Sequence, residues 1–398
     1  MSLQSVPSSE RLHIGFFGMR NAGKSSLVNA VTGQALSLVS DVKGTTTDPV
    51  KKAMELLPLG PVVIIDTPGL DDVGDLGAMR VQRARTMLDQ VNIAVLVVGS
   101  EWGMRAEDEM LLAEFRARKL PHVVCLNKCD LFSERAALGE NELYVSAVTG
   151  EGIEALKARL GRFAGERKAE KKIVADLLNP GDLALLVVPV DESAPKGRLI
   201  LPQQQTIREL LDHHMMAVVC QDTEVRKTLD MLAVKPKLVI TDSQAFERVA
   251  RDVPEDIRLT SFSILFARYK GSLKMLLSGA AALSALRDGD RVLIAEGCTH
   301  HRQCNDIGTV KMPRWIEQYT GKKLEYAFCS GGEFPQDLES YALVVHCGGC
   351  TLTEQMMQAS MMKAKQAGTP VINYGMAIAH MHGILKRSLA VFGNTHQL

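Results

Sequence analysis

Two short segments near the end of the chain combine cysteine with histidine. The first, CTH, contains Cys298 and His300, and the second, HCGGC, runs from His346 to Cys350. Thiolates and imidazoles at this spacing are metal ligands, so the segments could supply the two halves of one site. Zinc held by three cysteines and one histidine is one interpretation; a 4Fe-4S cluster on three cysteines is another. A redox-active cysteine pair is a third, but it leaves Cys298 and His300 without a role.

Both segments follow apolar stretches that are typical of buried strands. RVLIA spans Arg291 to Ala295, and YALVV spans Tyr341 to Val345. Loops at the carboxyl ends of parallel strands meet at one edge of a sheet. We therefore expect Cys298, Cys347 and Cys350 to face each other.

A different chemistry is indicated near the start of the chain. After a predicted strand at His13–Phe17, GMRNAGKS fits the phosphate-binding loop G-x-x-x-x-G-K-S. Its glycines let backbone N–H groups face phosphates at a helix N-terminus, Lys24 would reach the β- and γ-phosphates, and Ser25 would bind Mg²⁺. The residues expected to line the phosphates are Gly18, Asn21, Ala22, Gly23, Lys24, Ser25 and Ser26.

The segments VKGTTTDPV and VVIIDTPG would complete the hydrolytic site. Asp66 can hold the magnesium shell, the Gly69 amide can sense the γ-phosphate, and Thr46, with Thr45 as a near alternative, would close over the metal. Leu70 occupies the place of a water-positioning glutamine, so intrinsic hydrolysis should be slow unless another group assists. The predicted catalytic residues are Lys24, Thr46, Asp66 and Gly69.

Guanine selection is predicted from two later strands. HVVCLNKCD supplies Asn127, Lys128 and Asp130, and LYVSA ends in Ser146 and Ala147, whose backbone can face the guanine carbonyl. A carboxylate at Asp130 can accept both the N1–H and the 2-amino group of guanine, a donor pair that adenine lacks. The sequence therefore predicts an enzyme that hydrolyses GTP with Mg²⁺.

The middle of the chain alternates predicted strands with predicted helices. LALLVVPV, MAVVC and PKLVITD are apolar, and TIRELLDHH and EVRKTLDML have helical patterns. This alternation indicates a parallel sheet with flanking helices. It contains no second phosphate loop and no obvious catalytic set, so it is a candidate dimerisation region.

Bulk properties narrow the function classes. The 398 residues are 46% hydrophobic and 23% charged, with 46 Lys+Arg balancing 46 Asp+Glu. Neutral charge gives no general attraction to nucleic acid or membranes, and we expect neither as a partner. The short polar N-terminus does not resemble a signal peptide, and no apolar run could span a bilayer, so we expect a cytoplasmic protein.

Taken together, these motifs resemble a known family. The GTTTD segment and Asn21 are similar to elements of tRNA-modification and ribosome-assembly GTPases, in which the asparagine helps to bind K⁺. The combination with C-T-H and H-C-G-G-C, and with the middle segment GRLILPQQQTIRELLD, resembles the FeFe-hydrogenase maturation GTPases, HydF, over nearly the whole chain.

The resemblance implies a scaffold or carrier. It implies a 4Fe-4S cluster on Cys298, Cys347 and Cys350, with His300 and His346 as candidates for the open iron. It also implies receipt of a di-iron precursor from two radical-SAM maturases, delivery to apo FeFe-hydrogenase, and a homodimer through the middle domain. The alternative is a potassium-dependent GTPase of RNA modification or ribosome assembly with a structural zinc domain.

The expected fold is α/β with three domains. An N-terminal P-loop GTPase fold at residues 1–165 precedes two α/β parallel-sheet domains, for dimerisation at 176–260 and for iron–sulfur cluster binding at 261–398. The charged stretch between the first two is interpreted as a linker or hinge.

Overall fold

The computed structural model describes residues 6–34, 50–67, 86–101, 103–133, 135–166, 171–190, 199–297, 306–331 and 334–393. The chain divides into two compact units, Met1–Glu170 and Lys171–Leu398. Within the described ranges, no helix has the length and apolar character needed to cross a membrane.

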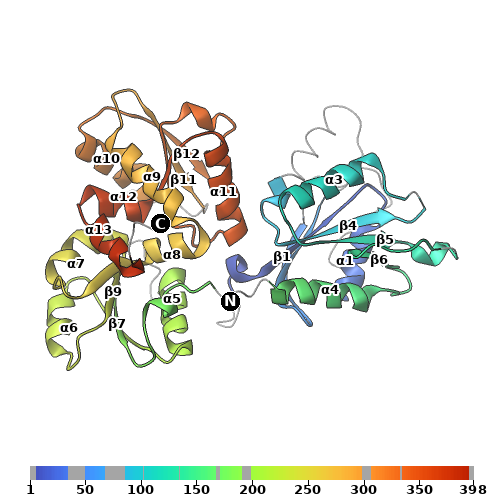
Figure 1. Cartoon of the computed structure of the whole chain (residues 1–398), viewed down its shortest axis with the longest axis horizontal. Helices are drawn as coiled ribbons and strands as arrows, with labels where there is room; N and C mark the ends of the chain where they lie inside the picture. Colours follow the sequence, from blue (N-terminus) through green and yellow to red (C-terminus); the bar gives the residue numbers. More distant parts are fainter. Residues whose placement is uncertain are drawn as a thin grey trace. The chain divides into compact units, whose positions relative to one another are not determined.

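The first unit is built on one six-stranded sheet with the order β2-β3-β1-β4-β5-β6, in which only β2 is antiparallel to its neighbour. Helices cover both faces, and Figure 1 shows α3 and α4 on opposite sides. The elements are β1 (Leu12–Phe17), α1 (Lys24–Thr32), β2 (Val50–Leu56), β3 (Gly60–Asp66), β4 (Ile93–Gly99), α3 (Ala106–Ala117), β5 (His122–Asn127), β6 (Glu142–Tyr144) and α4 (Ile153–Glu166).

Alternation along the strands explains why the sheet is covered on both faces. In β1, Phe16 packs in a core with Leu27 of α1 and Leu156 of α4, whereas Phe17 packs in a second core with Phe115 of α3. Successive side chains of a strand point to opposite faces, so an entirely apolar strand needs helices on both sides. The predicted α/β architecture of this region is confirmed.

The second unit contains two four-stranded sheets, both entirely parallel. The orders are β10-β9-β7-β8 and β12-β11-β13-β14. The strands are β7 (Leu183–Val187), β8 (Met216–Cys220), β9 (Leu238–Thr241), β10 (Arg258–Ser261), β11 (Arg291–Glu296), β12 (Glu325–Ser330), β13 (Leu343–His346) and β14 (Val371–Asn373). The helices are α5 (Leu201–Asp212), α6 (Val225–Met231), α7 (Phe246–Asp252), α8 (Phe262–Lys270), α9 (Leu273–Ser284), α10 (Met312–Thr320), α11 (Glu354–Gln366), α12 (Tyr374–Met381) and α13 (Leu385–Leu389).

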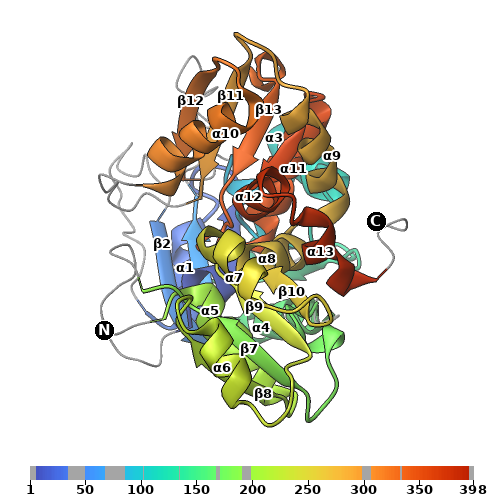
Figure 2. The same cartoon turned by 90° about the vertical axis from the view of Figure 1, so that its left-hand side faces the viewer.

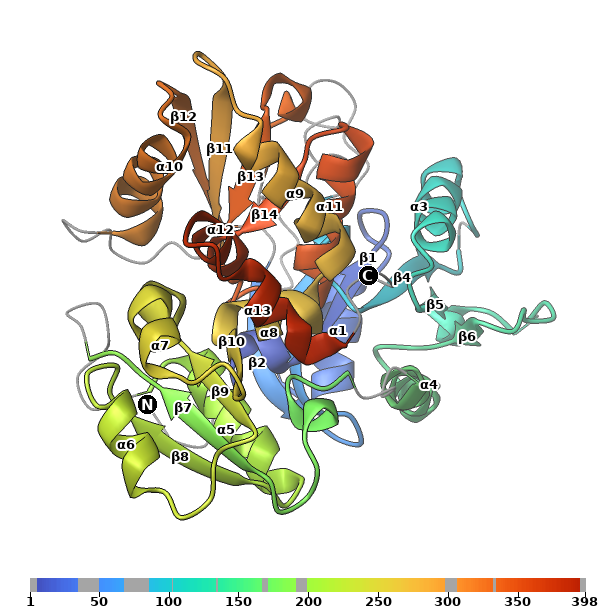
Figure 3. The ribbon, with the colours of Figure 1, turned by 60° about the vertical axis from the view of Figure 1, so that its left-hand side comes forward.

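Helix α8 connects the two sheets of this unit. It packs against α5 and β10 of the first sheet's layer and against α11, α12 and β14 of the second. Figures 2 and 3 both place it between the two sheets. Its fully buried Ile264 belongs to a single apolar cluster that also contains Val239 of β9 and Val344 of β13. The two sheets therefore share one core.

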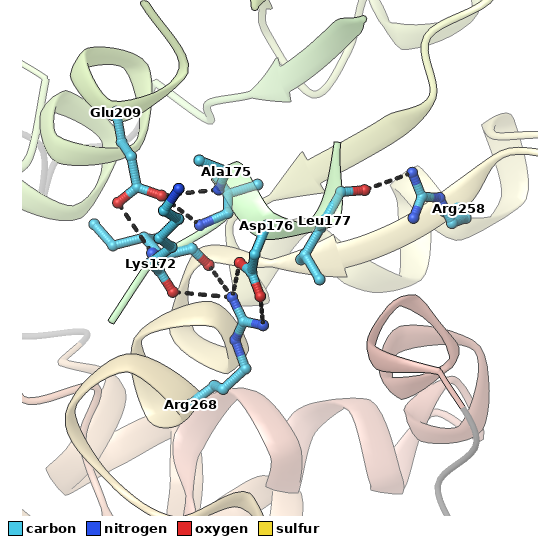
Figure 4. A network of polar contacts seen from close by, with 9 residues as sticks. Lys172, Ala175, Asp176, Leu177, Glu209, Arg258 and Arg268 are labelled. Atoms are coloured by element: carbon cyan, nitrogen blue, oxygen red, sulfur yellow. Dashed lines mark hydrogen bonds and ion pairs between the residues drawn. The ribbon is translucent and has the colours of Figure 1, made fainter. Parts of the chain in front are cut away.

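The beginning of the second unit is anchored by two charged side chains. The carboxylate of Glu209 on α5 accepts hydrogen bonds from the backbone N–H groups of residues 173, 174 and 175 at 2.8–3.0 Å. Arg268 on α8 donates to the carbonyls of Lys172 and Ile173 and pairs with Asp176 at 2.7 Å. Figure 4 shows this network. The chain that enters the unit is thus held to α5 and α8.

Candidate nucleotide site and cysteine loop

The phosphate-binding loop between β1 and α1 has the backbone that its glycines predict. Gly18 has φ of +138° and Gly23 has φ of +87°. A Cβ atom on Gly18 would stand 2.1 Å from the carbonyl oxygen of Val97, and one on Gly23 would stand 2.3 Å from Nδ2 of Asn127. Any other residue would clash at both positions, so the loop curls only with glycine there.

Lys24 and Ser25 lie at the first turn of α1, where phosphates bind. The ammonium group of the buried Lys24 donates to the carbonyls of Gly18 at 2.9 Å and Met19 at 2.7 Å, within the loop. The Ser25 hydroxyl donates to Oδ2 of Asp66 at 2.7 Å. The predicted phosphate and magnesium side chains are therefore brought together.

Asp66 carries a feature that fits Mg²⁺. Its other carboxylate oxygen, Oδ1, is buried and has no hydrogen-bond partner among the described residues. A buried unsatisfied carboxylate oxygen is costly unless something compensates it, and Mg²⁺ with its bound waters prefers such oxygen ligands. Ser25 and Asp66 are the side chains that would hold the ion. Thr46 and Gly69, the other predicted catalytic residues, lie outside the described residues.

Asn127 at the end of β5 joins the two nucleotide loops. Its Nδ2 donates to the carbonyl of Ala22 at 2.9 Å, and its Oδ1 accepts from the N–H of Ala147 at 3.2 Å. Ser146 beside it is fully buried, and its hydroxyl accepts from the N–H groups of residues 148 and 149. The predicted guanine-binding residues thus lie next to the phosphate loop.

The remaining guanine-side residues face outward. Lys128 has φ of +66° and forms an ion pair with Glu101. Asp130 is exposed, which leaves its carboxylate accessible to a base.

Asn21 of the phosphate loop is also exposed and has φ of +60°, a conformation that asparagine tolerates better than most residues. The left-handed backbone at position 21 therefore favours asparagine by itself, whether or not its side chain binds potassium. Ser26 is partly buried in α1.

The second site lies at the carboxyl edge of the β12-β11-β13-β14 sheet. Ala295 of β11 is in register with His346 of β13, so the two strands end side by side. The N–H of Gly297 donates to Sγ of Cys347 at 3.0 Å, and the N–H of Gly349 donates to the same sulfur at 3.4 Å. Cys298 and His300 follow Gly297 in the sequence and lie outside the described residues.

His346 presents a nitrogen suited to binding a metal. Its Nδ1 lies 2.7 Å from the carbonyl oxygen of Cys347, so Nδ1 carries the proton and Nε2 has a free lone pair. Nε2 is buried and has no hydrogen-bond partner among the described residues. Burial lowers the pKa of His346, which keeps the ring neutral.

The thiols of this edge are largely shielded from solvent. Burial raises the pKa of Cys347, and the N–H groups of Gly297 and Gly349 act in the opposite direction. Burial also raises the pKa of Cys350. Cys329, at the end of β12, belongs to the same edge: burial, followed by the nearby Cys347 and Glu296, raises its pKa to about 11. Among the described residues, no three histidine, cysteine or acidic side chains gather closely enough to hold a metal ion.

One buried side chain that contacts this edge was not predicted. Lys270 at the end of α8 is buried and donates to the backbone carbonyls of Gly349, Cys350 and Leu352. The surrounding sequence, ARYKGS, contains no known motif. The only signal that could have drawn attention to Lys270 is its position at the end of a helix, just before a glycine.

The fold and the nucleotide site of the first unit define a P-loop GTPase. Residues 13–128 match the protein family described as 50S ribosome-binding GTPase. Residues 173–271 match the Hydrogen maturase F dimerization domain, and residues 274–391 match the Hydrogen maturase F tetramerization domain. The chain belongs to the Hydrogen maturase F family, the GTPases of hydrogenase maturation, as its motifs predicted.

These matches establish several properties of the chain. Its N-terminal region is a GTPase domain, whose family implies GTP and Mg²⁺, and its fold is an N-terminal P-loop GTPase fold followed by parallel-sheet α/β regions. Both C-terminal matches are to oligomerisation domains, so the chain is an oligomer-forming member of the family. The sequence motifs implied a homodimer through the middle domain, whereas the match of residues 274–391 to a tetramerization domain was not expected.

Curated relatives include tRNA modification GTPases. MnmE from Nitrosomonas europaea is 35% identical over 161 residues, which are 39% of this chain and 35% of that protein. MnmE from Chromobacterium violaceum is 36% identical over 41% of this chain and 37% of that protein. The chain thus spans about a third of the length of these relatives. The crystal structure of a probable GTP-binding protein engB is 23% identical, covers 39% of this chain and all of that one, and has a TM-score of 0.33.

We predict that Asp130→Asn changes the nucleotide preference. An amide cannot accept both guanine donors, and a lost hydrogen bond to a charged group costs about 1.5–3 kcal/mol, so GTP should bind at least about tenfold more weakly. Xanthosine triphosphate should gain relative to GTP, because its 2-carbonyl accepts from the amide. Calorimetric titration with both nucleotides measures this, with the exposed Glu109→Gln of α3 as a control. Equal GTP affinity in variant and parent would remove the guanine-reading role of Asp130.

Proposed function

We propose that this protein is a cytoplasmic GTP-regulated carrier for FeFe-hydrogenase maturation. In this proposal, residues 1–165 form the GTPase domain, 176–260 the dimerisation domain and 261–398 the domain that binds a 4Fe-4S cluster. A di-iron precursor, received from two radical-SAM maturases, is the cargo, and apo FeFe-hydrogenase is the recipient. The observation that carries the proposal is the contact of Gly297, which precedes the C-T-H segment, with Cys347 of the H-C-G-G-C loop.

The residues of this edge fit an iron–sulfur cluster. Cys298, Cys347 and Cys350 would hold it, with His300 and His346 as candidates for the remaining iron. The orphaned Nε2 of His346 supports this assignment, as do the two N–H groups that donate to the Cys347 sulfur. Hydrogen bonds to cluster sulfurs tune Fe–S centres in general. When bound, the cluster would supply an iron to which an incoming ligand can attach.

The proposal is tested by separating the cysteine loop from GTP hydrolysis. We expect Cys347→Ala to lose iron and to fail in activating apo-hydrogenase, because an iron would lack its thiolate. GTP hydrolysis should stay near the parent rate, since the nucleotide site lies in the other compact unit. Cys220→Ala in β8 is the matched control and should behave as the parent. Normal hydrogenase activation by an iron-free Cys347→Ala would contradict the proposal.

A histidine variant refines the same test. His346→Ala should retain an iron–sulfur centre, because water or another ligand can substitute at one iron, but its electron paramagnetic resonance spectrum should change. A spectrum identical to that of the parent would remove His346 as the ligand of the remaining iron.

We further propose that K⁺ assists hydrolysis at the phosphate loop. Its support is the resemblance of Asn21 and the GTTTD segment to potassium-dependent GTPases, together with the exposure of Asn21 at this loop. Leu70 cannot position water, so another group, such as an ion, an acidic residue or a second subunit, has to assist hydrolysis. A cation could supply it.

We predict faster GTP hydrolysis in potassium than in sodium at equal ionic strength. An arginine finger in the same electrostatic role gives about 10³–10⁵-fold, so we expect at least about tenfold. Asn21→Gly should erase the difference, because glycine keeps the left-handed backbone and removes only the amide. Indistinguishable parent rates in the two salts would exclude the ion site.

We propose that the homodimer of the middle domain forms through the edge strand β8. In its sheet, the β10 edge is packed against α13, whereas β8 ends the sheet with Met216 and Val219 exposed by 53% and 45%. An apolar edge strand pairs readily with a second copy. The match of residues 173–271 to a dimerization domain supports this assignment.

We predict that Val219→Lys prevents two copies of the chain from pairing through β8, because charge on an edge strand opposes pairing. Sedimentation should show a particle half the parent's mass. The control is Met110→Lys on α3, an exposed apolar residue outside both oligomerisation-domain matches, which should leave the mass unchanged. An unchanged mass for Val219→Lys, at concentrations where the parent is fully associated, would exclude β8 as the dimer edge.

A second candidate is a potassium-dependent GTPase of RNA modification or ribosome assembly with structural zinc on the cysteine loop. The similarity to tRNA modification GTPases favours it. The two candidates differ in the metal content of the cysteine loop.

A further inference from the structure

The last residue of α8 contacts the cysteine loop from within the protein. The side chain of Lys270 is only 2% exposed. Its Nζ donates to the carbonyl oxygens of Gly349 at 3.1 Å, Cys350 at 3.2 Å and Leu352 at 2.8 Å. The loop that contains both thiols of the H-C-G-G-C segment is therefore wrapped around one ammonium group.

These contacts are suited to a buried positive charge. An ammonium has three N–H donors, and three carbonyls accept from this one. Burying a charge is costly unless such partners are present, and bonds from an ionised donor are stronger than neutral ones. The ring of Phe266, whose centroid is 5.7 Å from Nζ, adds a favourable cation–π contact. The conformation of the loop and the position of Lys270 thus depend on each other.

The base of this side chain is held firmly. Ser261 caps the start of helix α8, because its hydroxyl accepts from the N–H of Ile264, and Ile264 and Phe266 of the helix are almost fully buried. At its other end, a Cβ on Gly271 would stand 2.8 Å from the carbonyl oxygen of Ala267, so a side chain there would disturb the helix end. Lys270 is therefore fixed by the core that joins the two sheets.

We propose that Lys270 is a positioning residue for the cluster, which holds the Cys347–Cys350 loop in its binding conformation and places a fixed positive charge beside its thiolates. The proposal rests on the proposed cluster-binding function. Lys270 belongs to residues 173–271, which match the dimerization domain, whereas the cysteine loop belongs to residues 274–391, which match the tetramerization domain. The proposal therefore links these two regions.

The charge has a consequence that a purely structural contact would not have. Nζ of Lys270 donates to the backbone carbonyls of Gly349 and Cys350, so the positive charge lies beside the segment that carries both thiols. A cluster held by thiolates becomes more negative by one charge when it is reduced, and a nearby buried cation favours the more negative state. Removal of the charge should therefore lower the reduction potential of the cluster.

The experiment compares three variants of the full-length protein with a control. Lys270→Met removes charge and donors, Lys270→Gln keeps N–H donors without charge, and Lys270→Arg keeps the charge. Lys274→Met removes an exposed lysine from the following helix. Each protein is reconstituted anaerobically with iron and sulfide, and the potential is measured by titration followed by electron paramagnetic resonance. We expect lower reduction potentials for Lys270→Met and Lys270→Gln. The potentials of Lys270→Arg and of the Lys274→Met control should stay near that of the parent.

Hydrogen exchange of the cluster-free proteins provides a readout that needs no metal. The amides of residues 347–353 should exchange at least about tenfold faster in Lys270→Met, because the loop loses three hydrogen bonds. If the parent takes up no cluster, the proposed function fails, and exchange alone decides the role of Lys270. If Lys270→Met does not fold, the Gln and Arg variants carry the comparison. Potentials and exchange rates equal to the parent in the uncharged variants would overturn the proposal.

Discussion

Parallel pairing of strands constrains where chemistry can occur in this protein. In the first unit, β1, β3 and β5 run in one direction, so the phosphate loop, Asp66 and Asn127 follow their carboxyl ends at one edge. In the second unit, β11 and β13 are parallel neighbours in register, which brings Gly297 to Cys347. Both edges thus result from the same geometric rule, applied to different residues. Backbone amides and hydroxyls gather at the first, and thiols and an imidazole gather at the second, where the cluster is proposed.

Helix α8 is the element on which the second unit depends. Its N-cap residue Ser261 accepts from Ile264, its Arg268 binds the entering chain, and its last residue, Lys270, binds the cysteine loop. It also lies in the core common to both sheets. The entering segment and the cysteine loop are therefore attached to the same helix. A displacement of residues 172–176 would act on the helix that supports the proposed cluster site.

The sequence predicted those parts of the sites that depend on local patterns. The phosphate loop, the Ser25–Asp66 pair and the strand ends beside the cysteines follow from motifs and apolar runs, and they are found where expected. The strand β12 was not predicted, because its apolar run, YAFC, is only four residues long, and none of the six strand residues is fully buried. Lys270 was not predictable, because its partners are backbone carbonyls about 80 residues away, which no residue type marks. The tautomer of His346 likewise depends on a contact that only the folded loop creates.

The central claim is that the cysteine loop holds an iron–sulfur cluster in a GTPase. The most direct measurement is the content of iron, acid-labile sulfide and zinc in protein purified without oxygen. The account predicts a brown protein with about four iron and four sulfide per chain, as a 4Fe-4S cluster requires. A colourless protein with one zinc per chain and no sulfide would contradict it and would favour a structural zinc domain.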